Sequence, residues 1–384
     1  MRTIGIITFA RSDYSCCMPI ARAIQADPAL ELYLIVSGMH LSPTFGYTVQ
    51  DIEADGFKID EKLEILLSSD TPEGIAKSIG LGTICFAQSF TKFRPDILLI
   101  LGDRSELLSV VSAALPLCIP IAHVSGGDIT EGAIDNQVRH AVSKMSHLHF
   151  VAMQPHADRL LQMGEEPWRV HVTGEPALDL ISDMRLLTRE ELSNTLGLEL
   201  RQPLLLITFH PTTLGAIGVL EEIDNLLAAL DLIEGTLIFT HPNADANNEE
   251  IVRRIREFVA LRKNSALYQS LGQLKYYSLL SHADLMVGNS SSGIWEAPSF
   301  GLPVVNIGDR QQGRIRAGNV LDVPPEKSCI YNAIQEGLRS SFRNSLSNLI
   351  NPYGDGHAAN RIIEILRQVD LNQSLLKKSF FYPS

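Results

Sequence analysis

Short apolar runs alternate with longer amphipathic stretches along almost the whole chain. Runs of this kind, bounded by Gly, Pro and polar residues, are typical of buried parallel strands, and the stretches between them are typical of helices. The pattern therefore predicts an α/β architecture in which parallel sheets are covered by helices on both faces. The predicted strands are residues 3–9, 30–36, 97–101, 119–124, 148–152, 204–209, 236–240, 284–288 and 303–307.

The predicted strands fall into two groups, on either side of residues 175–201. A chain of 384 residues exceeds the size of about 250–300 residues at which single cores stop growing. We therefore predict a linker near residues 175–182 and two Rossmann-like, doubly wound domains, over residues 1–178 and 179–362. After the linker, the capping box Thr188-Arg-Glu-Glu191 predicts the start of a helix.

The end of the chain is predicted to return to the first domain. A last helix is expected at about residues 357–369, and the segment from about 363 to 384 is expected to pack back onto the first domain. Two doubly wound domains that face each other across a cleft would bind ligands at the carboxyl ends of their strands. The polar residues at those strand ends are therefore the candidates for function.

Composition and charge exclude several classes of function. With 45% hydrophobic and 20% charged residues, the chain resembles a soluble globular enzyme. A formal net charge of −12 argues against non-specific binding to nucleic acid or to an anionic membrane. No run of about 20 apolar residues is present, so no membrane span is predicted. The five cysteines lack C-x-x-C spacing and lie mostly in apolar stretches, which indicates reduced, mostly buried thiols in a cytoplasmic protein.

One strand end carries a pattern typical of phosphate binding. The predicted strand 284–288 leads into Gly288-Asn289-Ser290-Ser291-Ser292-Gly293, and a helix is predicted to follow. Such a turn aims backbone N–H groups and the positive end of the helix dipole at one point. Glu296 would repel a phosphate there, but it could accept hydrogen bonds from ribose hydroxyls. The pattern indicates a nucleoside diphosphate site, and an ordinary Ser/Gly-rich turn with a solvated glutamate fits it equally well.

Charged residues also follow the first and third predicted strands of the first domain. Arg11 lies at the entry of a helix predicted from about Ser15, where a guanidinium could bind two phosphate oxygens. A solvated surface arginine is the alternative. Asp103 follows the strand 97–101 and is either the N-cap of the next helix or a carboxylate that moves a proton.

The densest polar stretch, residues 123–140, follows the strand 119–124 and surrounds a Gly-Gly turn. A helix predicted from about Ile134 places Asp135 and Arg139 on one face, at positions i and i+4. They could form a structural ion pair. Alternatively, carboxylates crowded into a partly dry site would raise one another's pKa, as acid or base catalysis near neutral pH requires. The charged or titratable residues here are His123, Asp128, Glu131, Asp135, Arg139 and His140.

Two histidines occupy equivalent places in the second domain. His210 and His241 each follow an apolar strand and precede a proline, so both are expected at the rim of the cleft. Each could also be a hydrogen-bonded structural histidine. Metal-ligand spacing is missing, and neither G-x-G-x-x-G nor the Walker pattern occurs in its required context. No catalytic metal and no cofactor is therefore predicted.

Together with Phe209-His-Pro-Thr-Thr213 and Asn306-Ile-Gly-Asp-Arg310, these motifs resemble the UDP-N-acetylglucosamine 2-epimerases. The closest likeness is to the hydrolysing branch, which feeds sialic acid and related nonulosonate pathways, and it runs from residue 1 to about 366. The resemblance implies a glycosyltransferase-B-like fold with UDP in the cleft, and a homodimer or homotetramer. The implied reaction removes the C2 proton with anti loss of UDP, giving 2-acetamidoglucal, to which water adds to release N-acetylmannosamine.

The resemblance also implies roles for individual residues. Ser290, Ser291 and Arg11 would hold the diphosphate, Glu296 would hold the ribose, and Tyr276 and Arg310 would lie near the uracil. The acid/base candidates are Asp103, Glu131 and Asp135, with Asp128 beside them. His210 would stabilise charge on the departing diphosphate. The other candidates for binding the UDP-sugar are Arg139, His241, Asn243, Gly288, Asn289 and Ser292.

The chain departs from the family pattern at three places. Several members carry Glu in place of Ser125 and of Asp128, and the first departure leaves open which carboxylate moves the C2 proton. Asn136 stands where many members have a second acid, so Asp135 is the favoured residue of that pair.

Three other functions remain open. They are the same reaction on UDP-2,4-diacetamido-2,4,6-trideoxyglucose in the legionaminic acid pathway, a glycosyltransferase of the same fold, and a UDP-sugar binding module without catalysis. A glycosyltransferase would need an acceptor site. A binding module would need the phosphate site but not the carboxylates.

Overall fold

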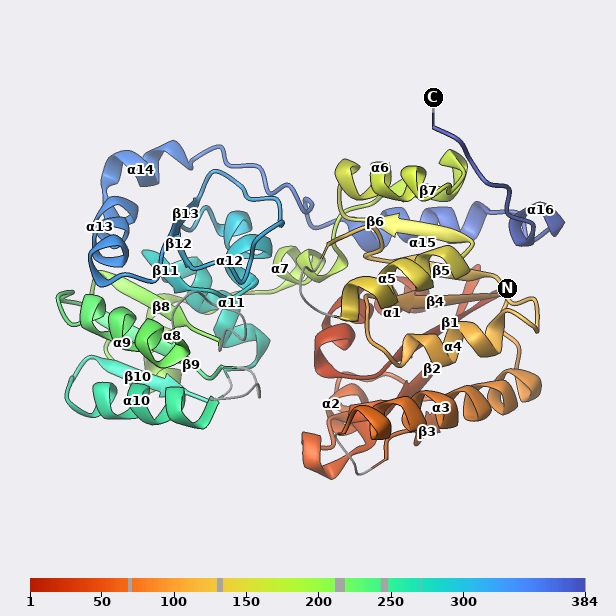
Figure 1. Ribbon diagram of the computed structural model, residues 1–384, viewed down its shortest axis with the longest axis horizontal. Coiled ribbons are helices and arrows are strands. Elements are labelled where there is room, and N and C mark those ends of the chain that lie inside the picture. Colours follow the sequence, from red (N-terminus) through yellow and green to blue (C-terminus); the bar gives the residue numbers. More distant parts are fainter. Residues whose placement is uncertain (68–70, 130–133, 211–217, 243–247, 270, 384) are drawn as a thin grey trace. The chain divides into compact units, whose positions relative to one another are not determined.

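The computed structural model describes residues 1–67, 71–129, 134–210, 218–242, 248–269 and 271–383 (Figure 1). The chain forms two compact units, of which the first consists of Met1–Ser182 with Tyr353–Ser384 and the second of Asp183–Pro352. The chain leaves the first unit close to the predicted linker. It returns at Tyr353, ahead of the position near residue 363 that the sequence suggested, so the whole last helix belongs to the first unit.

The first unit is built on a parallel sheet with strand order β3-β2-β1-β4-β5-β6-β7. Strand residues alternate between the two faces, so Leu98 and Ile100 of one strand enter the same apolar cluster while their neighbours face the opposite side. The strands are β1 (Arg2–Thr8), β2 (Leu30–Ser37), β3 (Glu61–Leu63), β4 (Ile97–Leu101), β5 (Ile121–Val124), β6 (Leu148–Val151) and β7 (Val170–Val172).

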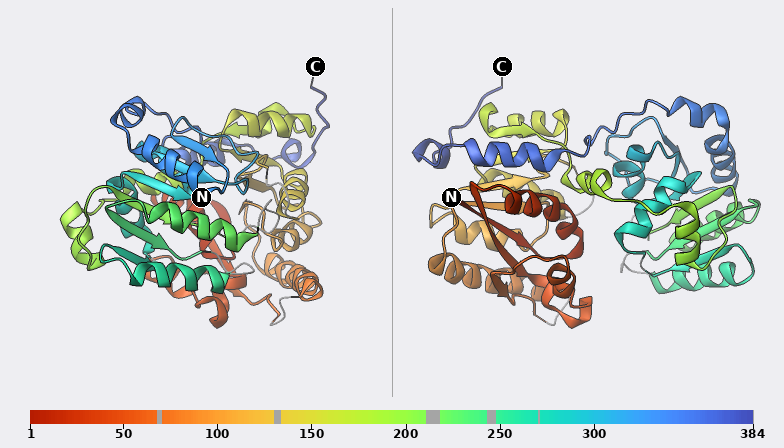
Figure 2. Two further views of the ribbon diagram at one scale, coloured as in Figure 1. Left: turned by 60° about the vertical axis from the view of Figure 1, so that its left-hand side comes forward. Right: turned by 180° about the vertical axis from the view of Figure 1, so that it is seen from behind.

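Helices cover both faces of this sheet (Figures 1 and 2). α3, α4 and α5 pack in a row on one face, and α1 packs with α15 on the other. The helices are α1 (Arg11–Ala26), α2 (Val49–Ala54), α3 (Pro72–Lys92), α4 (Leu107–Ala114), α5 (Ile134–Met145), α6 (Gln154–Gln162), α7 (Asp179–Asp183), α15 (Ala358–Gln368) and α16 (Gln373–Leu376), with the short 3₁₀ helices η1 (Gly38–Leu41), η2 (Pro43–Phe45), η3 (Pro167–Arg169) and η4 (Pro176–Leu178).

The second unit repeats this design with the strand order β10-β9-β8-β11-β12-β13, again with parallel pairing. α9 packs against both α10 and α13, and α8 packs with α11. The elements are β8 (Leu204–Thr208), β9 (Thr236–Thr240), β10 (Ser265–Tyr268), β11 (Leu285–Gly288), β12 (Val304–Ile307), β13 (Val320–Val323), α8 (Arg189–Leu196), α9 (Val219–Leu230), α10 (Asn248–Ala260), α11 (Gly272–His282), α12 (Ser292–Trp295), η5 (Ala297–Phe300), α13 (Lys327–Leu338) and α14 (Ser340–Ser345).

The predicted α/β class and the predicted strands are confirmed. Each of the nine apolar runs forms a strand, with ends that differ by a residue or two. The predicted capping box is also present, because the Thr188 hydroxyl accepts from the N–H of Glu191 and the Glu191 carboxylate accepts from the N–H of Thr188, at 3.2 and 2.8 Å. The sequence missed β3, β7, β10 and β13, and it placed the start of α1 too late.

The returning segment is attached to the first unit by specific contacts. The Asp179 carboxylate accepts hydrogen bonds from the N–H groups of Ala358 and Ala359 at 2.9 and 2.7 Å, so it caps the start of α15. α15 then lies along α1, as the view from behind shows (Figure 2). Further on, the buried Arg169 donates to the carbonyl oxygens of Ser374, Leu375 and Lys377.

The cysteines are all free thiols, but the expectation of mostly buried thiols is wrong. Cys17 is buried, Cys118 is exposed and the other three are partly exposed. Among the helices of the described residues, none combines the length and the apolar character needed to cross a membrane.

Candidate active site

Each sheet contains a point at which the order of the strands reverses. In the first unit this point lies between β1 and β4, and in the second between β8 and β11. Open parallel sheets bind ligands outside the carboxyl ends of the strands at such points, because the loops there diverge to opposite faces. Arg11 and Asp103 follow β1 and β4, and His210 and Gly288 lie at the ends of β8 and β11. Each unit therefore presents its candidate residues where this fold binds ligands.

Arg11 is the first residue of α1, where it is exposed. The helix begins here, four positions ahead of the predicted Ser15, because Asp13 fixes the turn before it. The buried Asp13 carboxylate accepts from the N–H groups of Phe9 and Ala10 at 2.6 and 2.9 Å. Arg11 thus lies at a helix entry beside the end of β1.

Asp103 forms an ion pair with Arg139 of α5. The cap interpretation of Asp103 is therefore wrong, since α4 begins after Glu106 instead. The ion pair of Arg139 predicted from the i, i+4 spacing with Asp135 is replaced by one that joins two elements. Arg139 is buried and Asp103 is partly exposed, so the carboxylate is the accessible member of this pair.

Asp135 lies in the first turn of α5, close to the same ion pair. Burial raises the pKa of its carboxyl, and the negative charge of Asp103 raises it further, against the opposing charge of Arg139. A carboxyl whose pKa is raised in this way, beside a second carboxylate, suits acid or base catalysis near neutral pH. Glu131, the third acid/base candidate, lies outside the described residues.

The turn after β5 places Asp128 in a buried position. Its carboxylate lies 3.3 Å from Nε2 of His156 and accepts from the N–H of Ile129 at 2.8 Å. Gly127 makes this close approach possible, because a Cβ there would lie 2.3 Å from the carbonyl oxygen of His156. The contacts with His156 and with the N–H of Ile129 therefore fix the position of the Asp128 carboxylate.

His123 is a structural residue. Its ring is fully buried, and the nitrogens lie 3.0 Å from the Ser143 hydroxyl and 2.8 Å from the carbonyl oxygen of Gly102. Burial lowers the pKa of this ring to about 3, so His123 stays neutral at physiological pH. It fixes the end of β5 against the end of β4. His140 is partly exposed, and burial and the charge of Arg139 lower its pKa.

Glu175 is an acidic residue that the sequence does not mark as functional, because residues 175–182 have the pattern of a linker. It follows the unpredicted strand β7, and its buried carboxylate accepts a hydrogen bond from the Ser125 hydroxyl at 3.0 Å. The sequence signal that could have found it is the turn Thr173-Gly174-Glu175-Pro176, an acidic residue after a glycine at the end of a short strand.

In the second unit, Asn289 connects the ends of β8 and β11. Its side-chain amide accepts from the N–H of His210 at 2.7 Å and donates to the carbonyl of the same residue at 2.9 Å. Gly288 has a φ of +137°, and a Cβ there would lie 1.9 Å from the carbonyl oxygen of Thr208. Glycine and asparagine thus hold the two central strand ends together.

The predicted phosphate site differs in one respect from the sequence expectation. The helix after it, α12, has only four residues and continues into η5, so the helix dipole contributes little. Ser290 and Ser291 are partly exposed, whereas Ser292 is buried and accepts from the Tyr276 hydroxyl at 2.7 Å. Local N–H and hydroxyl groups, rather than a long helix, are the donors available to an anion.

The residues expected to hold ribose and uracil lie next to this turn. The Glu296 carboxylate accepts from the Tyr277 hydroxyl at 3.0 Å. Burial raises the pKa of Glu296, while hydrogen bonds from Ser292 and Tyr277 oppose that rise. Arg310 donates to the carbonyl oxygen of Asn289 at 3.2 Å, so its guanidinium lies beside the strand end.

His210 is buried at the end of β8. Burial lowers the pKa of its ring to about 4, and the charge of Arg310 lowers it too, so the ring is neutral at pH 7 without a bound anion. It can stabilise a leaving phosphate as a hydrogen-bond donor. His241 is partly exposed, and its backbone N–H donates to the backbone carbonyl of Tyr268 at 3.1 Å. Asn243 lies outside the described residues.

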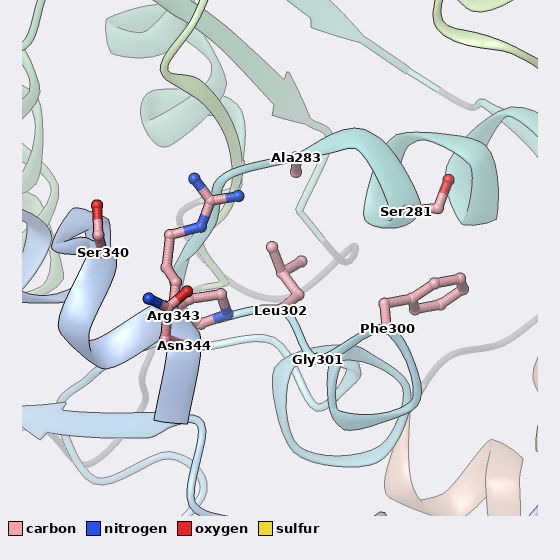
Figure 3. Close-up of a pocket in the computed structure, with 9 residues that line it drawn as sticks. Ser281, Ala283, Phe300, Gly301, Leu302, Ser340, Arg343 and Asn344 are labelled. Carbon is pink, nitrogen blue, oxygen red and sulfur yellow. The ribbon is translucent and has the colours of Figure 1, made fainter. Parts of the chain in front are cut away.

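A cavity of about 330 Å³ in the second unit lies away from these residues (Figure 3). Its lining includes Ala283 and Leu302, which precede β11 and β12, together with Arg343 of α14. It is therefore at the amino ends of the strands, opposite the candidate site. Within the described residues, no group of three or more His, Cys, Asp or Glu side chains is placed to hold a metal ion.

Known proteins resemble this chain over its whole length. The sequence model of the UDP-N-acetylglucosamine 2-epimerase family matches residues 22–367. A Campylobacter jejuni protein named GDP/UDP-N,N'-diacetylbacillosamine 2-epimerase (hydrolyzing) is 41% identical over 382 residues, which are 99% of this chain and 98% of that protein. The UDP-N,N'-diacetylbacillosamine 2-epimerase (hydrolyzing) of Legionella pneumophila is 33% identical over 382 residues and is covered, like this chain, over 100% of its length.

Solved structures share the fold. A putative UDP-N-acetylglucosamine 2-epimerase from Listeria monocytogenes superposes with a TM-score of 0.81 at 20% identity, over 95% of each chain. The UDP-GlcNAc 2-epimerase from Neisseria meningitidis, bound to UDP-GlcNAc, gives 0.76 at 19% identity over 95% of this chain and 99% of the other. The two units are thus the Rossmann-like pair of the glycosyltransferase-B-like fold. On the strength of the match over residues 22–367 and of the full-length relatives, the chain belongs to the UDP-N-acetylglucosamine 2-epimerase family.

Proposed function

We propose that the protein is a hydrolysing 2-epimerase that converts a UDP-linked 2-acetamido sugar into UDP and the free sugar inverted at C2. The observation that carries this proposal is the pair of carboxyls, Asp103 and Asp135, grouped around the buried Arg139 at the reversal point of the first sheet. A binding module would not need two coupled carboxyls there. The family membership of the whole chain supports the same reaction.

The first unit supplies the acid and base chemistry. A C2 proton next to an acetamido group is barely acidic, so a positioned base must remove it while the diphosphate leaves. The bonding electron pair of C2–H becomes the C1=C2 double bond, and the C1–O bonding pair leaves with UDP. The carboxyl of this pair that is ionised takes the proton, and Arg139 holds Asp103 in place through their ion pair.

The second unit binds the nucleotide. The partly exposed hydroxyls of Ser290 and Ser291, the nearby N–H groups and the neutral His210 donate hydrogen bonds to the diphosphate. Charge develops on that diphosphate as the C1–O bond breaks, and fixed donors stabilise developing charge more effectively than water does. Glu296 accepts from the ribose, with Arg310 and Tyr276 nearby.

The C4 and C6 substituents of the sugar distinguish two substrates. The relatives from Campylobacter jejuni and Legionella pneumophila are named for N,N'-diacetylbacillosamine, a 2,4-diacetamido-2,4,6-trideoxy sugar. We propose the UDP-linked form of this sugar as the substrate, in preference to the UDP-N-acetylglucosamine expected from the sequence. UDP-N-acetylglucosamine, with N-acetylmannosamine as product, is the second candidate, because a Neisseria meningitidis relative of that name is 32% identical over 338 residues.

Incubation of the purified protein with each UDP-sugar in D₂O, without any acceptor, tests both points. We expect UDP and free sugar in equal amounts, deuterium at C2, and faster release from the diacetamido substrate. A glycosyltransferase would leave both nucleotide sugars intact or transfer them without exchange at C2. Faster release of N-acetylmannosamine would make UDP-N-acetylglucosamine the substrate.

The carboxyl pair can be tested by amide substitution. Asp103→Asn or Asp135→Asn should lower kcat by about 100-fold or more, because each variant lacks a group that exchanges a proton. UDP affinity should stay within about tenfold, or about 1.4 kcal/mol, since UDP binds to the other unit. Asp158→Asn, at an exposed position of α6, is the control. Parallel losses of turnover and UDP binding would assign the pair a structural role instead.

A further inference from the structure

A buried carboxyl near the candidate site has no role in the mechanism above. Glu175 follows β7 after Gly174, and its N–H donates to the carbonyl oxygen of Tyr353 at 2.7 Å. The residue is only 5% exposed. Buried acids are ordinarily paired with a cation or replaced by apolar residues, because an isolated buried charge is costly. The surroundings of Glu175 therefore need an explanation.

Its hydrogen-bond donors are uncharged. The carboxylate accepts from the Ser125 hydroxyl at 3.0 Å, and the thiol of Cys16 and the N–H of Ala177 also favour its ionised form. Among the described residues Glu175 forms no ion pair, and the negative charge of Asp128 raises its pKa further. Burial raises the pKa of Glu175 to about 7. A carboxyl with these neighbours exchanges its proton close to neutral pH.

The titratable groups around Glu175 come from three elements. Cys16 of α1 keeps its proton, because burial raises the pKa of its thiol well above the ordinary value. Asp128 belongs to the turn after β5, and His156 of α6 lies 3.3 Å from it. None of these places a fixed positive charge on Glu175.

Ser125 directly follows β5, so it lies at the carboxyl ends of the strands, where the other catalytic candidates also lie. Its φ of +61° is rare for a residue with a side chain, and its N–H donates to the carbonyl of Phe150 at 2.9 Å. Such a conformation persists only where the surroundings fix it, and it is found most often at functional sites. Ser125 is partly exposed while Glu175 is buried, so the hydrogen bond links the buried carboxyl to a residue that reaches the surface.

Inversion at C2 requires two proton-exchanging groups. A proton leaves one face of the sugar and another arrives on the opposite face, and one group cannot reach both. Asp103 and Asp135 are grouped around Arg139 and form one such centre. Resting on the function proposed above, we propose that Glu175 is the acid of the second centre, and that it acts through the Ser125 hydroxyl when water adds to the unsaturated sugar.

The protons balance over one turnover. Elimination transfers the C2 proton to Asp103 or Asp135, which later releases it to solvent. In the second half of the reaction Ser125 gives its hydroxyl proton to the other face of C2 and takes the proton of Glu175 in the same motion. The C1=C2 electron pair forms the new C2–H bond, water oxygen bonds to C1, and the second proton of that water returns through Ser125 to Glu175. Glu175 is therefore a positioning residue that holds the proton, and Ser125 is the group that meets the sugar.

The two halves of the reaction give a sharp test. Native protein and Glu175→Gln are supplied with the UDP-sugar that the native enzyme turns over fastest, and UDP, free sugar and unsaturated sugar are measured over time. We expect the variant to release UDP and to accumulate the unsaturated sugar, with free sugar formed at least about 100-fold more slowly. UDP affinity should change by less than about twofold. Ser125→Gly, which preserves the positive φ, should show the same accumulation, and the double variant should lose little more.

The pH profile separates a proton-holding role from a structural one. An acid must be protonated to act, so free-sugar formation by the native enzyme should decline as pH rises through about 7, following the pKa of Glu175. That decline should be missing in Glu175→Gln. Glu166→Gln, which removes a partly exposed carboxylate elsewhere in the first unit, serves as the matched control and should keep the native profile.

If the native protein turns over a UDP-sugar, two outcomes would refute the role of Glu175 without refuting the proposed function. One is a Glu175→Gln protein with native proportions of free sugar and the native pH profile. The other is an equal fall of UDP and free-sugar release with no unsaturated product and a lower melting temperature, which would make Glu175 a structural acceptor. Failure of the native protein to release sugar from any UDP-sugar would instead refute the proposed function, and this assignment with it.

Discussion

Gly288 shows how strictly a single residue can be determined by the packing of two strand ends. It lies where β11 passes β8 at the reversal point of the second sheet, with a φ of +137°. A Cβ at this position would lie 1.9 Å from the carbonyl oxygen of Thr208. Neither the backbone conformation nor the space admits another residue type.

Gly288→Ala should therefore destabilise the second unit by several kcal/mol, because strain and a backbone clash act together. UDP binding should be lost with it, since Asn289 and Ser290 follow directly. Thermal denaturation and UDP titration measure the two effects. The matched control is Gly80→Ala, at an exposed position of α3 with no atom within 4 Å of the added Cβ. This control should be neutral or stabilising by about 0.5–1 kcal/mol.

Residue types at strand ends could be predicted from the sequence, but their partners could not. Asp103 was ambiguous because an aspartate after a strand suits a helix cap as well as catalysis. Arg139 pairs with Asp103, far along the chain, rather than with its helical neighbour Asp135. Glu175 has the sequence pattern of a linker residue, because nothing local reveals that Ser125 will contact it. Which side chains meet at the carboxyl ends of the strands depends on strand order, and local sequence patterns do not contain that order.

At the level of elements, the strands that the sequence missed share one property. β3 and β7 are the two edges of the first sheet, and β10 and β13 are the two edges of the second. An edge strand is covered by fewer neighbours, so its residues need not be apolar. β3, for example, is Glu61-Lys62-Leu63 without a fully buried position. Continuous apolar runs identify central strands, and hydrophobic pattern alone therefore underestimates the width of such sheets.

The cap of α15 by Asp179 can be tested at the same level. Asp179 accepts from two N–H groups of the first turn, which would otherwise be buried without partners. Asp179→Ala should lower the free energy of unfolding of the first unit by about 1–2 kcal/mol, measured by denaturant titration. Faster amide exchange in the first turn of α15 should accompany this loss. Asp370→Ala, exposed just beyond the same helix, should cost less than about 0.5 kcal/mol.

At the scale of the whole chain, a buried cluster fixes the carboxyl terminus to the first unit. Glu165 is fully buried, and its carboxylate binds Lys144 and Lys378 at 2.6 and 2.7 Å and Nε2 of His149 at 2.9 Å. Burial lowers the pKa of His149, so the two lysines carry the positive charge at neutral pH. Burial alone would raise the pKa of Glu165, but these hydrogen bonds outweigh it and lower the pKa to about 2.

This cluster predicts an acid-sensitive terminus. A carboxyl whose pKa is lowered on folding contributes stability above its ordinary pKa of 4.5, and that contribution is lost as pH falls from 4.5 toward 2. Between pH 6 and pH 3.5, native protein should lose about 1 kcal/mol more of its unfolding free energy than Glu165→Gln does. Trp168 is stacked on Arg169 at 4.1 Å and supplies a fluorescence signal for the release of the terminus. Equal losses of unfolding free energy in both proteins would show that Glu165 is not the cause of the acid sensitivity.

The return of the chain at Tyr353 has a consequence for biosynthesis. The second unit is one uninterrupted segment, Asp183–Pro352, whereas α15 and the residues after it are made later than this segment and complete the first unit. On the ribosome, the later-encoded unit can thus reach its final form while the earlier-encoded one still lacks a helix. During that interval the uncovered side of α1 is open to chaperones and proteases, so a nascent chain stalled before residue 358 should be cleaved near its start and not within its middle.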